Sequence, residues 1–328
     1  MEEFIRKMPK AELHAHLNGS VSGATLRKLA QKKGVHFVRS SFLLGDSDRN
    51  YRAAFQRFNA VCQLVTTCED VTMVTKEVVE EFLYDDNAVI DGIGCWDPAD
   101  IVVKLLVSID RRDSPSTAAE VIDLASRYPE HVVGVDLCGP PHMDARHLVG
   151  PLQRARQLGL SLALHVAECE THVDDTLLAL RPERVGHATF LDLDRLEVGN
   201  PNCAVEVCTT SNRLCGTIDS PLDHKLLCQL YERRKQDLTL NVPWSNQGDE
   251  RSSNQRIGIC LSTDDKGVFD TTLTAEFVSF CAAFGVTDKE VVCRLSLESL
   301  RRGFASTVEL DRVYERHWAP FLRKVQVL

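Results

Sequence analysis

Short apolar runs alternate along this chain with longer stretches in which apolar residues recur at helical spacing. Such runs predict buried strands, and the longer stretches predict amphipathic helices. The predicted strands are 11–16, 101–110, 132–137, 161–166, 184–188, 204–208 and 258–263. The predicted helices are 24–33, 52–64, 71–82, 116–127, 145–158, 171–180, 221–234, 273–284 and 288–304. Strands that alternate with helices in this way indicate a parallel sheet, and therefore an α/β fold.

The number of strands decides between an open sheet and a closed barrel. Seven strands are one too few for a barrel of eight. The missing second strand has one candidate, 88–94, in which Asp91 and two glycines make a poor β segment, and the residues after it resemble a turn. We predict that residues 1–328 form a single TIM (β/α)8 barrel domain whose second strand is the least well defined.

The composition indicates a globular protein that binds neither nucleic acid nor membrane. With 44% hydrophobic and 26% charged residues, the chain can bury a large core and cover it with polar side chains. A net charge of −9 argues against a nucleic-acid surface, which normally carries a basic patch. Neither a signal peptide nor a membrane span is recognisable, so we expect a cytoplasmic protein and a monomer. The 12 cysteines form no Cys-x-x-Cys pair, which favours reduced thiols over disulfides and over zinc held by cysteine.

Two histidines stand at the end of the first predicted strand. His14 and His16 are two residues apart, so their side chains point to the same face of a strand. Two neutral imidazoles on one face suit Zn²⁺. A pair of this kind also occurs by chance, as an exposed or hydrogen-bonded pair, so the motif alone leaves both interpretations open.

Histidine and aspartate recur where further strands end. His165 closes the strand 161–166, His187 follows the next strand, and Asp264 and Asp265 follow the last one. Taken singly, His165 also suits a core histidine bonded to a carbonyl, and the Asp pair suits a solvated helix N-cap. Taken together, they place His or Asp at four strand ends of a barrel, which is where barrel enzymes build their active sites.

The chain resembles the adenosine deaminase family of metal-dependent hydrolases, and most closely its adenosine deaminase-like branch, the N6-methyl-AMP deaminases. Six blocks carry the resemblance: MPKAELHAHLNGS at 8–20, GVDLCG at 134–139, ALHVAE at 163–168, RVGHATF at 184–190, TSN at 210–212 and TDDKGVF at 263–269. The resemblance implies a zinc-dependent hydrolase that converts N6-methyl-AMP and other N6-substituted purine nucleoside monophosphates to IMP and an amine. It implies one zinc ion per chain, held by His14, His16, His165 and Asp264.

The same resemblance assigns the catalytic residues. Glu168 would give a proton to purine N1, while His187 and Asp265 would orient the attacking water, and Asp265 would also reach the base. Protonation of N1 makes C6 electrophilic, and zinc makes water a nucleophile at neutral pH. These roles are therefore chemically consistent with one another.

Further residues would contact the substrate. The resemblance places His16 and Asp265 near the purine, Gly139 against its edge, and Asn18 and Asp110 at the ribose and phosphate end. Glycine lets a ring approach the main chain closely. Gly139 also suits a simple turn, and Asp110, which precedes two arginines, also suits a surface ion pair. Asn18 stands where adenosine deaminases proper have an Asp, which would repel a phosphate, so we expect a nucleotide substrate. Phosphate donors are expected from Thr210, Ser211, Asn212 and Lys266.

The chain departs from the family pattern at three places. Residues 89–98 contain no arginine where the family has a nucleotide-contacting Arg-x-x-Pro-Arg segment, residues 239–256 replace a short link with a His-His-Phe element, and Cys62 replaces a histidine. These changes predict weaker phosphate binding. The alternatives are an adenosine deaminase acting on the free nucleoside and an inactive purine-binding variant with a damaged barrel. Another kind of metal-dependent barrel hydrolase would carry a lysine in 132–137, which has none.

Overall fold

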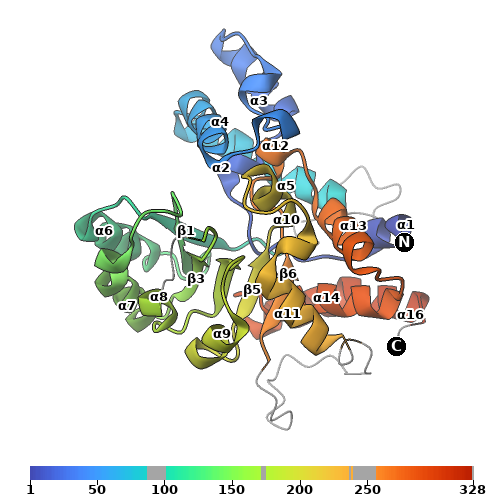
Figure 1. The fold of residues 1–328 in the computed structure, drawn as a ribbon. Helices are drawn as coiled ribbons and strands as arrows, with labels where there is room; N and C mark the ends of the chain where they lie inside the picture. The colour runs from blue at the N-terminus through green and yellow to red at the C-terminus, as the bar shows by residue number, and fades with distance from the viewer. Residues whose placement is uncertain (87–100, 171–174, 236–237, 239–255, 327–328) are drawn as a thin grey trace.

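The computed structural model describes the chain except for residues 87–100, 171–174, 236–237, 239–255 and 327–328. Its described residues form one sheet of six parallel strands in the order β1-β2-β3-β4-β5-β6 (Figure 1). The strands are β1 (Leu105–Asp110), β2 (Val132–Cys138), β3 (Ser161–Val166), β4 (Arg184–His187), β5 (Ala204–Val207) and β6 (Gly258–Leu261). These six strands were predicted, and their sequential parallel order confirms the α/β class. The candidate second strand, 88–94, lies outside the described residues.

The first predicted strand is replaced by a single bridge. Of the predicted strand 11–16, only Ala15 pairs, in a parallel bridge with Asp264. The amide of His16 donates to the carbonyl of Asp264 at 3.0 Å, and the amide of Asp264 donates to the carbonyl of His14 at 2.8 Å. The segment therefore occupies the first-strand position next to β6, although it is no regular strand.

The side chain of Glu12 explains this correction. Its carboxylate accepts the amide of His14 at 2.9 Å and the amide of Thr263 at 3.0 Å. The Thr263 hydroxyl donates to the same carboxylate at 2.8 Å. Amides bound to a side chain cannot take part in a strand ladder, so a carboxylate joins the two segments where regular pairing was expected.

Helices surround the sheet and agree with the predicted helical stretches. In chain order they are α1 (Glu2–Lys7), α2 (Leu17–Ser20), α3 (Gly23–Lys33), α4 (Tyr51–Leu64), α5 (Cys68–Asp86), α6 (Pro115–Ala125), α7 (Val149–Gln157), α8 (Asp175–Leu178), α9 (Leu193–Gly199), α10 (Thr209–Leu214), α11 (Lys225–Arg234), α12 (Lys266–Phe269), α13 (Leu273–Phe284), α14 (Lys289–Arg301), α15 (Thr307–Val313) and α16 (Ala319–Lys324). All nine predicted helices overlap with these, whereas α1, α2, α9, α10, α12, α15 and α16 were not predicted. Within the described part of the chain, no helix has the length and apolar character needed to cross a membrane.

Side-chain caps set the starts of several helices. Asn50 accepts the amide of Ala53 where α4 begins, and Thr272 accepts the amide of Ala275 where α13 begins. Each cap satisfies an amide that the first helical turn leaves without a partner.

The described residues form three apolar clusters, of which the smallest, with Ala54, Leu214 and Val268, joins α4, α10 and α12. The largest cluster joins the strands to the helices around them, with α6 and α7 beside β1 and β3 and with α14 beside β6 (Figure 1). The remaining cluster, which includes Leu26, Val61 and Val74, holds α3, α4 and α5 together. The helices α2, α3, α4 and α12 gather at one end of the molecule in Figure 1. This end adjoins the segment that carries His14 and His16.

Candidate metal centre

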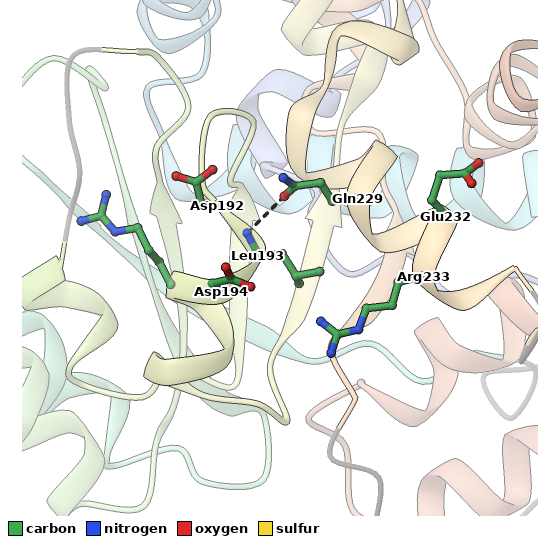
Figure 2. A pocket seen from close by; sticks show the side chains of 7 residues that line it. Asp192, Leu193, Asp194, Gln229, Glu232 and Arg233 are labelled. Carbon is green, nitrogen blue, oxygen red and sulfur yellow. Dashed lines mark hydrogen bonds between the residues drawn. The ribbon is translucent and has the colours of Figure 1, made fainter.

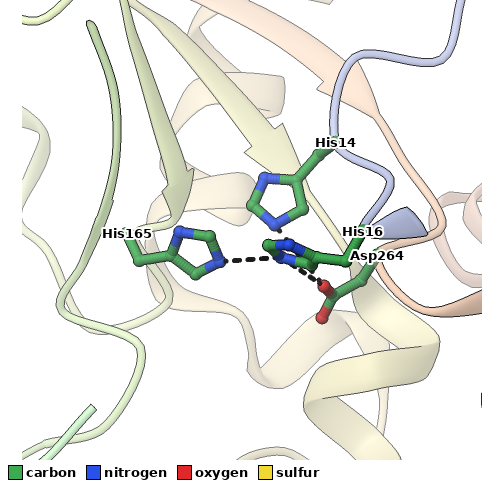
Figure 3. A group of neighbouring side chains, drawn as sticks. All are labelled: His14, His16, His165 and Asp264. Carbon is green, nitrogen blue, oxygen red and sulfur yellow. Dashed lines mark hydrogen bonds and ion pairs between the residues drawn. The ribbon is translucent and has the colours of Figure 1, made fainter. Parts of the chain in front are cut away.

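Three histidines and one aspartate converge where the strands end. His14, His16, His165 and Asp264 each offer one ligand atom, and these atoms all lie within 4.8 Å of one another (Figure 3). His16 Nε2 lies 3.2 Å from Asp264 Oδ1 and 3.3 Å from His165 Nε2. His14 Nε2 lies 3.5 Å from the same Asp264 oxygen. The four residues predicted to bind the metal are thus brought together from three separate segments.

The surroundings of this cluster fit a metal cation. His14 Nε2 is buried and has no hydrogen-bond partner among the described residues. Burial opposes protonation of His14, but the carboxylates of Glu206 and Asp264 outweigh it and raise its pKa well above the usual value. A buried excess of carboxylates favours a positive charge between them. Three imidazole nitrogens with one carboxylate oxygen are a donor set that zinc prefers.

Buried carboxylates contact the Nδ1 atoms of two of the imidazoles. His14 Nδ1 lies 2.6 Å from Glu206 Oε2, and His165 Nδ1 lies 3.0 Å from Asp136 Oδ1. Glu206 is also paired with the buried guanidinium of Arg184. Carboxylates in this position fix which ring nitrogen faces the metal. No role was predicted for Glu206 and Asp136, and the signal that could have marked them is a charged residue inside an apolar strand.

Glu168 and His187 lie beside the cluster. His187 Nε2 is 3.7 Å from Glu168 Oε1 and 3.8 Å from Asp264 Oδ2. Burial lowers the pKa of His187, so the ring is neutral at neutral pH. The structure therefore places two predicted catalytic groups next to the predicted ligands.

Asp265, the third predicted catalytic residue, is buried against Gly19. A Cβ atom at Gly19 would lie only 1.6 Å from Asp265 Oδ1, so no other residue fits there without moving the carboxyl group. Burial and the adjacent charge of Asp264 raise the pKa of Asp265 well above its usual range. A carboxyl group of this kind can hold a proton near neutral pH.

Left-handed backbone conformations are concentrated at these strand ends. Ala167, His187, Ala188 and Asp264 have φ angles of 44°, 55°, 51° and 63°. Residues with a Cβ rarely adopt such angles, at a cost on the order of 1–3 kcal/mol each. Ser211 holds Asp264 in place, because its hydroxyl donates to Asp264 Oδ2 at 2.6 Å. Strain of this kind is typical of a site that must aim particular side chains.

Two predicted substrate contacts, Gly139 and Asp110, lie together at the ends of β2 and β1. A Cβ atom at Gly139, where φ is 99°, would be 2.7 Å from Asp110 Oδ1. The Asp110 carboxylate accepts hydrogen bonds from Arg112 Nε at 2.8 Å and Arg112 Nη2 at 2.7 Å. The ion pair considered as an alternative for Asp110 is therefore present.

The residues expected to bind phosphate have varied surroundings. Asn18 is exposed, and its amide donates to Cys62 Sγ at 3.6 Å. The amide of Asn212 donates to Thr217 Oγ1 at 3.3 Å, and Lys266 Nζ lies 3.4 Å from Glu81 Oε2. The side chains of Ser211, Asn212 and Lys266 therefore already have partners within the protein. Asn18 is thus the most accessible of the expected contacts.

A separate surface cavity lies between α9 and α11. It has a volume of about 620 Å³ and is lined by Asp192, Leu193, Asp194, Arg195, Gln229, Glu232 and Arg233 (Figure 2). Gln229 spans the two elements, because its side chain accepts the amide of Leu193 at 3.2 Å. None of these residues belongs to the metal cluster, and their charges have both signs.

Comparison with known proteins gives one consistent result. The adenosine deaminase family model matches residues 87–242. An N6-methyl-AMP deaminase of Danio rerio is 33% identical over 98% of this chain and 97% of its own length. The solved structure of the ADAL–IMP complex is 26% identical, with a TM-score of 0.78 over 98% of this chain and 100% of that one. Arabidopsis ADAL complexed with GMP is 28% identical, with a TM-score of 0.79 over 97% of this chain and 98% of that one. These neighbours have the adenosine deaminase type of TIM barrel, which confirms the predicted fold class.

Proposed function

Because this chain belongs to the adenosine deaminase family, we propose that it hydrolyses N6-methyl-AMP and related N6-substituted purine nucleoside monophosphates to IMP and an amine. The observation that carries this proposal is the convergence of three histidines and Asp264, with Glu168 and His187 beside them. This arrangement combines a metal donor set with a proton donor, which hydrolytic removal of an amine from a purine requires.

The proposed cofactor is one zinc ion per chain, held by His14, His16, His165 and Asp264. Zinc supplies the Lewis acidity that makes water a nucleophile at neutral pH. The carboxylates of Glu206 and Asp136 keep the rings of His14 and His165 in the orientation that binding needs.

The protein's own groups perform the proton transfers. Glu168 donates a proton to purine N1, which makes C6 accept the nucleophile, and the bond from C6 to the amine then breaks as the amine takes up the proton that the attacking water has given up. His187 is neutral and lies 3.7 Å from Glu168, so it can orient the attacking water and accept its proton. We assign Asp265, whose carboxyl group can stay protonated, a contact with the purine base.

Substrate preference rests on the residues at the entrance to the site. The side chain of Asn18 is neutral, so it lacks the charge by which an Asp there would repel a phosphate, roughly 1–4 kcal/mol at about 4 Å. The nucleotides in the similar solved structures, IMP and GMP, are both monophosphates. Without arginine in 89–98, and with Lys266 close to Glu81, we propose a preference for monophosphates with low affinity.

Steady-state rates on N6-methyl-AMP, AMP and adenosine test the proposal. We expect the zinc-loaded protein to turn over N6-methyl-AMP fastest and the Glu168→Gln variant to serve as the inactive control. Faster turnover of adenosine would assign the free nucleoside as substrate. Binding of IMP without turnover of any of the three would identify the chain as a purine-binding variant.

A further inference from the structure

The imidazoles around the metal centre are oriented in two different ways. Glu206 and Asp136 face the Nδ1 atoms of His14 and His165 at 2.6 Å and 3.0 Å. His187 has no such support, because its carboxylate contacts all involve Nε2, and among the described residues no carboxylate is paired with its buried Nδ1. Its Nε2 contacts, at 3.7 Å and 3.8 Å, are longer than hydrogen bonds. Something other than a bond to the ring must therefore fix its direction.

The direction of the His187 side chain is set by its main chain. His187 and Ala188 are consecutive left-handed residues, with φ angles of 55° and 51°. The amide of Ala188 donates to the carbonyl of Val166 at 3.0 Å, which secures one side of this turn. A strained backbone persists only where the surrounding structure holds it, so the carbonyl of His187 also needs a partner.

His224 is that partner. It is buried at the start of α11, and its Nε2 lies 3.0 Å from the carbonyl oxygen of His187. Its other nitrogen, Nδ1, lies 3.2 Å from the amide of Leu227. Because an amide can only donate, Nδ1 is the acceptor and Nε2 carries the hydrogen that is donated to His187. Burial lowers the pKa of His224 to about 4, so this arrangement is kept at neutral pH.

We propose that His224 is a positioning residue that holds the left-handed backbone of His187 and so directs its imidazole between Glu168 and Asp264. The two hydrogen bonds of the His224 ring join it to the carbonyl of His187 and the amide of Leu227, and neither of these residues is a proposed metal ligand. It acts through one carbonyl group, and its effect on catalysis rests on the proposed function.

A double-mutant cycle tests whether His224 acts through His187. We expect His224→Leu to lower kcat on N6-methyl-AMP roughly 10- to 100-fold, the scale of a misplacement of about 1 Å, with KM and bound zinc almost unchanged. In a His187→Ala background the same substitution should change kcat less than about twofold. An equal loss in both backgrounds, or no loss in wild type, would overturn the proposal.

Two further variants separate positioning from stability. Leu230→Ala removes a buried side chain from the same helix, and it should lower the melting temperature while leaving kcat unchanged. His224→Gln restores a donor for the His187 carbonyl, so it should keep more of kcat than His224→Leu. If His224→Leu does not fold, the cycle is completed with His224→Gln, and an equal loss in both backgrounds again refutes the role.

A spectroscopic readout keeps this test independent of the substrate. In protein with ¹³C-labelled histidine rings, His224→Leu should shift or broaden the His187 signal while leaving those of His14 and His165 in place. An unchanged His187 signal contradicts the proposal. If the wild-type protein does not turn over N6-methyl-AMP, the proposed function fails, but this spectrum still decides the role of His224.

Discussion

The cluster of candidate metal ligands and the adjoining end of β4 hold their histidines by opposite means. His14 and His165 are oriented at the ring, each by a buried carboxylate from a strand of the sheet, Glu206 on β5 and Asp136 on β2. His187 is oriented at the backbone, by a left-handed turn and a hydrogen bond from the start of α11. The first kind of support lies within the sheet itself, whereas the second depends on an element outside it. Substitutions that remove the ring support should therefore weaken metal binding, whereas substitutions that remove the backbone support should lower kcat.

The difference also follows from the chemistry that each ring performs. A ligand must present one nitrogen at a fixed distance, and a carboxylate at the other nitrogen fixes the orientation of the ring and makes it a more basic ligand. A group that exchanges protons works with a pKa near the operating pH. Burial lowers the pKa of His187, whereas a carboxylate at its Nδ1 would raise the pKa and favour the charged imidazolium, so support through the backbone leaves the ring neutral and able to accept a proton.

The largest expected effect is loss of the metal centre. The His14→Ala, His165→Ala double variant removes two of the four ligands, and we expect zinc content to fall from one ion per chain to almost none. Activity should fall to background. Elemental analysis of the purified protein measures the content, and an unchanged stoichiometry would refute the ligand assignment.

Replacement of Glu168 should separate catalysis from metal binding. Glu168→Gln keeps the shape of the side chain but cannot supply a proton to N1. We expect kcat to fall about 10²–10⁴-fold with zinc content unchanged, the range of a general acid. Single-turnover rates with N6-methyl-AMP measure the loss. A decrease below tenfold would place Glu168 outside the proton transfer.

Removal of ring support should weaken the metal site without abolishing it. Glu206→Gln replaces the carboxylate behind His14, and we expect zinc affinity to fall about 10- to 100-fold. Competition with a chromophoric chelator measures the affinity. The matched control is Glu197→Gln, which alters a surface pair with Arg233 and should leave zinc affinity unchanged. Equal affinities for both variants would show that the ring of His14 needs no such support.

The backbone support should have a characteristic pH dependence. The pKa of His224 is about 4 in the folded protein, against about 6.5 in an unfolded chain. The unfolded state therefore binds more protons, and the stability that neutral His224 contributes is present above pH 6.5 and lost as the pH falls towards 4. The expected slope is about 1.4 kcal/mol per pH unit in that window. Urea denaturation of wild type and His224→Gln should give a difference that narrows on acidification. A constant difference would contradict the assigned protonation state.

The site residues that could be predicted are those whose position follows from the sequence pattern immediately around them. His165 and Asp264 follow apolar runs, so their position at strand ends could be inferred from local pattern alone. Glu206 could not be assigned in this way, because its partner His14 is 192 residues away in the chain. His224 falls within the predicted helix 221–234 but is the residue before α11 in the structure, and nothing in the local pattern indicates a bond to a backbone carbonyl. Supporting contacts between distant segments depend on the packed structure rather than on a motif.

The fold, too, was predicted correctly only where the local sequence pattern decides the structure. Six strands were predicted because buried parallel strands are continuous apolar runs. The segment 11–16 has a similar run, but the side chain of Glu12 takes the amide of His14, and only a bridge remains. Competition between a side chain and the ladder for the same amide is decided by the tertiary structure.

The bridge at Ala15 also links metal binding to folding. Asp264 lies on one side of this junction, and His14 and His16 lie on the other, so a bound ion joins the two segments that a single bridge and Glu12 otherwise connect. Opening the junction separates the ligands, and by thermodynamic linkage a metal that binds only the closed form stabilises that form. Each tenfold rise in free zinc above its dissociation constant would add about 1.4 kcal/mol to the stability of the closed junction.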